Sequence, residues 1–142
     1  MAEPYCLAMV LCDAVHRDPS TGKSTILGTF SNFTAAGFPA KIKLGIYFAV
    51  TDGLGPVTLR FQLVKAAEPV DALDETENEN RVFMVKTDVN FESPLVMVEG
   101  GLEAETILPA EGLYYCELWA AGEVLMSRRL TATKITSSNE GT

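Results

Sequence analysis

The chain of 142 residues has little of the chemistry that catalysis usually requires, since it contains one histidine and three cysteines. His16 is the only candidate base for a serine nucleophile, and no serine lies in a Gly-x-Ser-x-Gly turn. One histidine and three dispersed cysteines also fall short of a tetrahedral zinc site. We therefore expect a protein that is not an enzyme, needs no cofactor and carries His16 as a surface or loop residue.

The cysteines indicate a reducing compartment. Cys6, Cys12 and Cys116 are an odd number, and none belongs to a Cys-x-x-Cys pair. Cys6 and Cys12 are expected on one face of a single strand, roughly 20 Å apart, which is too far for a disulfide bond. We interpret all three as reduced, buried side chains. The first residues also lack the basic region of a secretory signal, so we predict a cytoplasmic protein.

Basic residues are few and scattered, with 11 Lys and Arg against 19 Asp and Glu and a net charge of −8. This composition argues against nucleic acid as a partner. No apolar run is long enough to span a membrane, and an anionic membrane surface would repel the chain. Six of the acidic residues lie in the segment 68–80, which has no basic residue. The acidity is therefore predicted to belong to one loop.

What the chain does contain is apolar residues at every second position. The alternation runs from Ile42 to Val50, and it resumes from Val57 to Leu63 after a turn rich in glycine and proline. A period of two on both sides of a turn predicts an antiparallel hairpin over 41–65 with one buried face.

Similar patterns predict about eight strands and no helix. They cover 5–12, 24–33, two strands within 41–65, 81–89, 95–108, 113–120 and 124–132. Few connections have room for helical crossovers, so the expected fold is all-β: an antiparallel two-sheet β-sandwich, immunoglobulin-like or C2-like. Residues 1–132 form a single domain in this interpretation, and 133–142 form a flexible polar tail.

Two resemblances support this interpretation. The stretch from Leu108 to Tyr114 resembles the corner of immunoglobulin-like sandwiches, in which a tyrosine packs or hydrogen-bonds against the turn. Most of the chain also resembles a family of small, uncharacterised bacterial proteins of about this length. That likeness rests on Leu11–Val15, Thr21–Lys23, Ile26–Phe30, Phe38–Ala40 and Tyr47–Gly53. It implies a bacterial cytoplasmic domain of unknown function, and it implies no activity and no site residues.

Gly22-Lys23-Ser24 ends like a phosphate-binding P-loop. That motif needs a glycine five positions before Gly22, where Arg17 stands, and a helix after the serine. The residues after Ser24 have strand character instead, so we predict a hairpin turn.

Exposed aromatic residues are the stronger binding candidates. If Tyr114 points inward, Tyr115 and Trp119 share the opposite face of their strand and form a platform for a protein partner or a second copy of the chain. The alternative is that another part of the protein covers them. We therefore predict a non-enzymatic protein-binding or self-assembly module.

A second hypothesis is a calcium- or small-ligand-binding sandwich that uses acidic loops. The candidate ligands are five aspartates in predicted loops: Asp13, Asp18, Asp52, Asp71 and Asp74. The acidic segment lacks the glycine of an EF-hand loop, so the leading expectation remains no metal.

Overall fold

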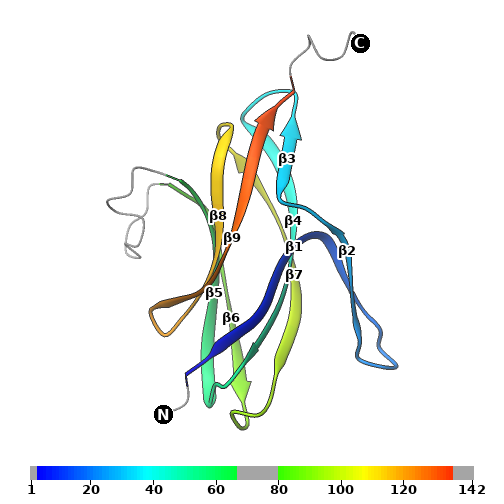
Figure 1. The fold of residues 1–142 in the computed structure, drawn as a ribbon, viewed down its shortest axis with the longest axis vertical. Helices are drawn as coiled ribbons and strands as arrows, with labels where there is room; N and C mark the ends of the chain where they lie inside the picture. The colour runs from blue at the N-terminus through cyan, green and yellow to red at the C-terminus, as the bar shows by residue number, and fades with distance from the viewer. Residues whose placement is uncertain (1–2, 67–79, 136–142) are drawn as a thin grey trace.

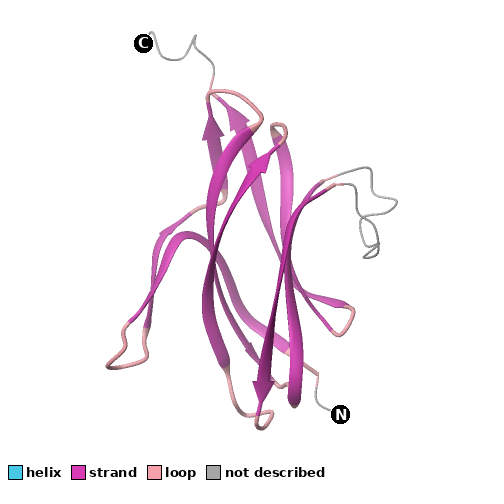
Figure 2. Cartoon of the chain, turned by 180° about the vertical axis from the view of Figure 1, so that it is seen from behind, coloured by secondary structure: helices cyan, strands magenta, loops and turns pink. Residues whose placement is uncertain are grey.

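The computed structural model describes residues 3–66 and 80–135, and within them the chain forms strands and turns without a helix (Figures 1 and 2). There are nine strands in this part of the chain: β1 (Tyr5–Arg17), β2 (Ser24–Thr29), β3 (Asn32–Ala35), β4 (Ala40–Thr51), β5 (Gly55–Lys65), β6 (Arg81–Phe91), β7 (Val98–Leu108), β8 (Gly112–Ala120) and β9 (Glu123–Lys134). None of the described segments is a helix able to cross a membrane.

The strands form two sheets. The first has the order β2-β1-β4-β7 and the second the order β3-β9-β8-β5-β6. Their facing sides share one apolar core, as the rings of Phe48 in β4 and Phe61 in β5 illustrate with centroids 4.9 Å apart. Each fully buried side chain of this size stabilises the fold by about 1.5–3 kcal/mol. The predicted all-β class with two sheets is confirmed.

The predicted hairpin over 41–65 is wrong in its pairing. Both strands alternate as expected, but β4 lies in the first sheet and β5 in the second, so the turn between them connects the two sheets. Gly53 in this turn has no room for a side chain, because a Cβ there would lie 2.4 Å from the Phe91 ring. A period of two shows that each strand buries one face, and it does not show which strand is its neighbour.

The strand predicted over 24–33 is also divided. The chain passes from the first sheet to the second between β2 and β3, and β3 pairs with β9 in parallel. Backbone hydrogen bonds from Phe30 N to Leu11 O (3.1 Å) and from Thr131 N to Ser31 O (3.0 Å) fix this crossing. The sheets are therefore not purely antiparallel, and the strand count in the described residues is nine rather than eight.

The same pairing extends the last strand beyond the predicted end of the domain. Thr133 and Lys134, which were assigned to the tail, pair with Thr34 and Ala35 of β3. Residues 136–142 of the predicted tail lie outside the described residues.

Cys6 and Cys12 do not share a face. The register of β1 on β4 shifts between Cys6 and Ala8, so one extra residue reverses the orientation of those that follow. Met9 and Leu11 therefore point into the core, while Cys12 lies buried outside it. All three cysteines are free and buried, and burial raises the pKa of each thiol, for Cys116 to about 12.

The hairpin of β1 and β2 folds over the outer face of the first sheet, and we call residues 13–29 the arm (Figure 1). Two glycines of that sheet lie directly beneath it. A Cβ on Gly45 would lie 3.3 Å from the carbonyl oxygen of Asp13, and a Cβ on Gly101 would lie 2.6 Å from Cβ of Val15. Glycine at these positions lets the arm approach the sheet closely.

Candidate functional site

Three exposed apolar side chains follow one another in the β6–β7 loop. Leu95 is 93% exposed, and Val96 and Met97 beside it are exposed as well. This loop lies at the end of the molecule where the chain also turns from β4 to β5 (Figure 1). Scattered exposed leucines are normal, but a run of exposed apolar residues in one loop is a candidate for a binding surface.

Hydrogen bonds from the end of β4 hold this loop in place. Asp52 N donates to Pro94 O (3.1 Å), and the Thr51 hydroxyl lies within bonding distance of Pro94 O (3.3 Å) and Val96 O (3.2 Å). Within the loop, Val96 N donates to Ser93 O (3.1 Å). The apolar side chains are therefore presented on a backbone that is already ordered, which lowers the entropy cost of binding.

Neighbouring segments extend the same apolar area. Tyr5 pairs with Thr51 on the other side of β4, and both Tyr5 and Leu54 are more than half exposed. Leu54 also lines a depression of about 340 Å³ together with Pro4 and Ala121. We call the set of five exposed side chains the loop-end surface: Tyr5, Leu54, Leu95, Val96 and Met97.

The sequence did not reveal this surface, because Leu95 to Met97 were assigned to a strand over 95–108. The strand begins at Val98. A usable signal was present: Pro94 follows Ser93, and three consecutive apolar residues come before the alternation begins. Pro and Ser favour a turn, and an apolar run beside a turn without alternation is the pattern of an exposed loop tip.

Trp119 and Tyr115 do lie on the outer face of the second sheet, opposite the buried Tyr114, but they do not form an exposed platform. Trp119 is 5% exposed and Tyr115 is half-buried. The guanidinium of Arg60, on the neighbouring strand, stacks over the indole ring at 4.6 Å from its centroid. The binding prediction for this pair therefore lacks the exposed ring on which it depended.

The same face holds a buried polar network. The Glu117 carboxylate accepts hydrogen bonds from Gln62 Nε2 (2.9 Å) and Trp119 Nε1 (3.0 Å), and Arg81 donates to Gln62 Oε1 (3.3 Å). Gln62 and Glu117 are both buried. Because each buried polar group has a partner, the network fixes the side chains of the outer face rather than leaving them available for a ligand.

The predicted calcium ligands do not come together. Asp13 lies in β1 rather than in a loop, against Gly28, and Asp52 lies in the turn between the sheets. Asp18 accepts hydrogen bonds from Ser20 N (2.9 Å) and Ser20 Oγ (2.8 Å), which lower the pKa of its carboxyl group. Within residues 3–66 and 80–135 no group of three or more His, Cys, Asp or Glu could hold a metal ion. Asp71 and Asp74 lie outside the described residues.

The predicted hairpin turn at Gly22-Lys23-Ser24 is confirmed. Asp18 N donates to Lys23 O and Gly22 N to Asp18 O, both at 2.8 Å, and Gly22 has φ of 73°. β2 follows the turn, so no helix N-terminus is available for a phosphate. His16 is exposed in β1, opposite Thr25 of β2.

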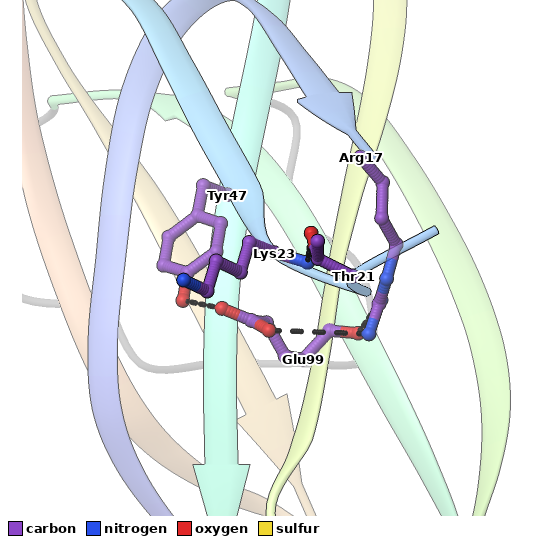
Figure 3. Close-up of polar contacts among 5 residues, drawn as sticks. All are labelled: Arg17, Thr21, Lys23, Tyr47 and Glu99. Carbon is purple, nitrogen blue, oxygen red and sulfur yellow. Dashed lines mark hydrogen bonds and ion pairs between the residues drawn. The ribbon is translucent and has the colours of Figure 1, made fainter. Parts of the chain in front are cut away.

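A polar cluster fastens the arm to the first sheet (Figure 3). Tyr47 of β4 donates a hydrogen bond to Glu99 of β7, whose backbone oxygen accepts from Arg17 of the arm (3.2 Å). The Arg17 and Glu99 side chains lie 4.0 Å apart. Burial and the Glu99 carboxylate raise the pKa of Tyr47 to about 12, so it acts as a donor and not as a base.

One further contact defines the class of the fold. The Tyr114 hydroxyl lies 2.5 Å from Ala110 O, to which it donates, and it accepts from Ala110 N at 3.3 Å. A tyrosine at the start of a strand that bonds back to the preceding corner is a hallmark of immunoglobulin-like sandwiches. The molecule is thus an all-β protein of two facing sheets with an immunoglobulin-like corner. The chain belongs to a family of unknown function, DUF6941, whose model matches residues 7–133.

Two solved structures are similar to the chain. The chain is similar to the Pseudomonas fluorescens alkylpurine DNA glycosylase AlkC bound to DNA containing an abasic site analog, with TM-score 0.55 and 10% identity over 93% of this chain. It spans only 31% of the glycosylase chain, so this likeness concerns the fold alone. It is also similar to an immunoglobulin-like protein from Pseudomonas aeruginosa, with TM-score 0.46 and 14% identity over 92% of this chain and 97% of that one. No curated protein matches the chain.

Proposed function

We propose that this chain is a non-enzymatic protein-binding module of the bacterial cytoplasm, built as an immunoglobulin-like sandwich, and that it binds its partner through the loop-end surface. The observation that carries the proposal is Leu95, which is 93% exposed on a hydrogen-bonded loop. A few anchor residues that enter a partner's pockets supply most of the affinity of a protein interface.

The charge of this region favours a protein partner over the alternatives. Segments 4–5, 52–58 and 92–97 contain no lysine or arginine, and they include Asp52 and Glu92. DNA, to which the similar glycosylase is bound, and anionic lipid both need basic residues at the contact. The three reduced cysteines support a cytoplasmic location.

The test compares capture by three forms of the chain from an extract of the native host. Leu95→Asp removes the most exposed anchor, and Ile107→Asp makes the same change at another exposed position, in β7. Burying a leucine contributes about 1.5–3 kcal/mol, so Leu95→Asp should weaken binding of the purified partner by roughly ten- to a hundredfold. Ile107→Asp should leave the affinity unchanged.

Two results would contradict the proposal. The first is a set of captured proteins that is the same for the wild type and Leu95→Asp. The second is flotation with vesicles of neutral or anionic lipid that depends on Leu95, which would make the surface a lipid contact. Both variants should keep the far-ultraviolet circular dichroism of the wild type, because neither side chain belongs to the core.

A further inference from the structure

Two thirds of the last strand has an open edge among the described strands. β3 begins at Asn32, which pairs with Thr131, so among the described strands none lies beside 123–130 of β9 on that side. Thr131 N donates across this edge to Ser31 O (3.0 Å). Main-chain groups alternate in direction along a strand, so those of Arg129 and Ser127 point the same way, beyond the end of β3.

This edge is accessible. Ser127, Arg128 and Arg129 are exposed, and the two arginines line a groove of about 350 Å³. Met9–Leu11 of β1 form the other wall of the groove, and Arg128 Nε donates to Met9 O across it (2.8 Å). An exposed strand edge with free main-chain groups pairs readily with another strand.

The charges along the edge indicate which strand fits. Glu123 stands at its beginning, and Arg128 and Arg129 stand near its end. Two copies of β9 that run antiparallel bring the Glu123 of each beside the arginine pair of the other, whereas a parallel arrangement brings like charges together. Opposite charges across a strand pair stabilise it, and like charges destabilise it.

From this pattern we propose that the edge of β9 over 123–130 is a self-association site, where a second copy of the chain adds its own β9 in antiparallel orientation. The pair is two-fold symmetric, with Met126 and Ser127 near the axis, and it joins the second sheets of both copies into one continuous sheet. This surface is separate from the loop-end surface, so it does not depend on the partner proposed above.

The experiment is the solution mass of the full chain by light scattering over a dilution series. The wild type should pass from dimer to monomer on dilution. Ser127→Pro should be monomeric throughout, since it removes an edge donor and leaves the ladder with β8 intact. Glu123→Arg should raise the dimer dissociation constant roughly tenfold through two unfavourable pairs. Glu103→Arg, the same change on β7, should not raise it.

A second measurement keeps the proposal testable if Ser127→Pro does not fold. In the proposed pair the two Ser127 residues lie diagonally across the axis, so a bismaleimide with a short spacer should cross-link Ser127→Cys into a dimer. Glu103→Cys should not be cross-linked, and the native cysteines are buried and do not interfere. A wild type that is monomeric at every concentration, or equal cross-linking of the two cysteine variants, would overturn the proposal. A dimer lost in Leu95→Asp and retained in Ser127→Pro would place the contact at the loop-end surface and overturn it as well.

Discussion

Gly101→Ala tests directly whether the arm packs on the first sheet. An ideal Cβ at this position lies 2.6 Å from Cβ of Val15 and 2.8 and 2.9 Å from its two γ carbons. Carbon atoms pack at about 3.5–4.0 Å, so the methyl group and the arm cannot both keep their places. The backbone of Gly101 does not lie in the left-handed region, so alanine is acceptable there on conformational grounds.

The sign of the effect distinguishes the two possibilities. Where space is open, replacing glycine by alanine stabilises a protein by about 0.4–1 kcal/mol, because the unfolded chain loses freedom. Overpacking costs about 1–3 kcal/mol. With the arm on the sheet, the net result is a loss of about 1–2 kcal/mol in the free energy of unfolding. For a domain of this size, that loss lowers Tm by about 3–8 °C.

The assay is thermal and urea unfolding followed by circular dichroism. Gly37→Ala is the matched control, because nothing lies within 4 Å of a Cβ there, and it should be neutral or stabilising. Val15→Gly removes the clashing atoms, so the double variant with Gly101→Ala should recover most of the loss in a double-mutant cycle. If Gly101→Ala raises Tm as Gly37→Ala does, the arm does not rest on the sheet and the reasoning fails.

Three further predictions concern ionisation, the covered tryptophan and calcium. Folding raises the pKa of Tyr47 from 10.0 to about 12, so the unfolded chain loses this proton at a lower pH than the folded one. The free energy of unfolding should therefore fall as the pH rises from 10 to 12, and Tyr47→Phe should flatten that decline. Trp119 is the only tryptophan and is buried beneath Arg60, so its fluorescence should resist quenching by acrylamide. Arg60→Ala should increase the quenching constant severalfold, and equal quenching in both proteins would contradict the stacking. Millimolar calcium should leave Tm unchanged, because Asp13, Asp18 and Asp52 form no cluster in the described residues. A Tm that rises with calcium concentration would show that the protein does bind the ion.

The alternation of apolar residues was sufficient to predict the strands and their buried faces, because it reflects burial directly. Phe48 and Phe61 were both expected to be buried, and both enter the core. The division of strands between sheets was not accessible, since the same period fits a strand paired with either neighbour. The extra residue at Leu7 was equally hidden, because only the pairing with β4 reveals it, and it turns Cys12 away from the core.

For the candidate site, too, the sequence predicted what depends on neighbouring residues and missed what depends on the pairing of distant strands. That Trp119 lies on the outer face could be predicted from Tyr114, but its covering by Arg60 depends on β5 lying beside β8. The sequence pattern also predicted that Leu95 lies in a strand, because apolar residues are common both in strands and at exposed binding sites. Only the hydrogen bonds between Pro94 and the end of β4 separate the two cases.

The crossing from β2 to β3 also sets the order in which the chain acquires its structure. Asn32 bonds to Thr131, 99 positions later in the sequence, and β3 pairs with no other described strand. During synthesis, β3 therefore has no partner until residues 131–134 have been added. Contacts between such distant residues slow folding, because the intervening chain must first be ordered. The second sheet is therefore completed only after β9 has left the ribosome, and its exposed apolar strands depend on that last step for protection from aggregation.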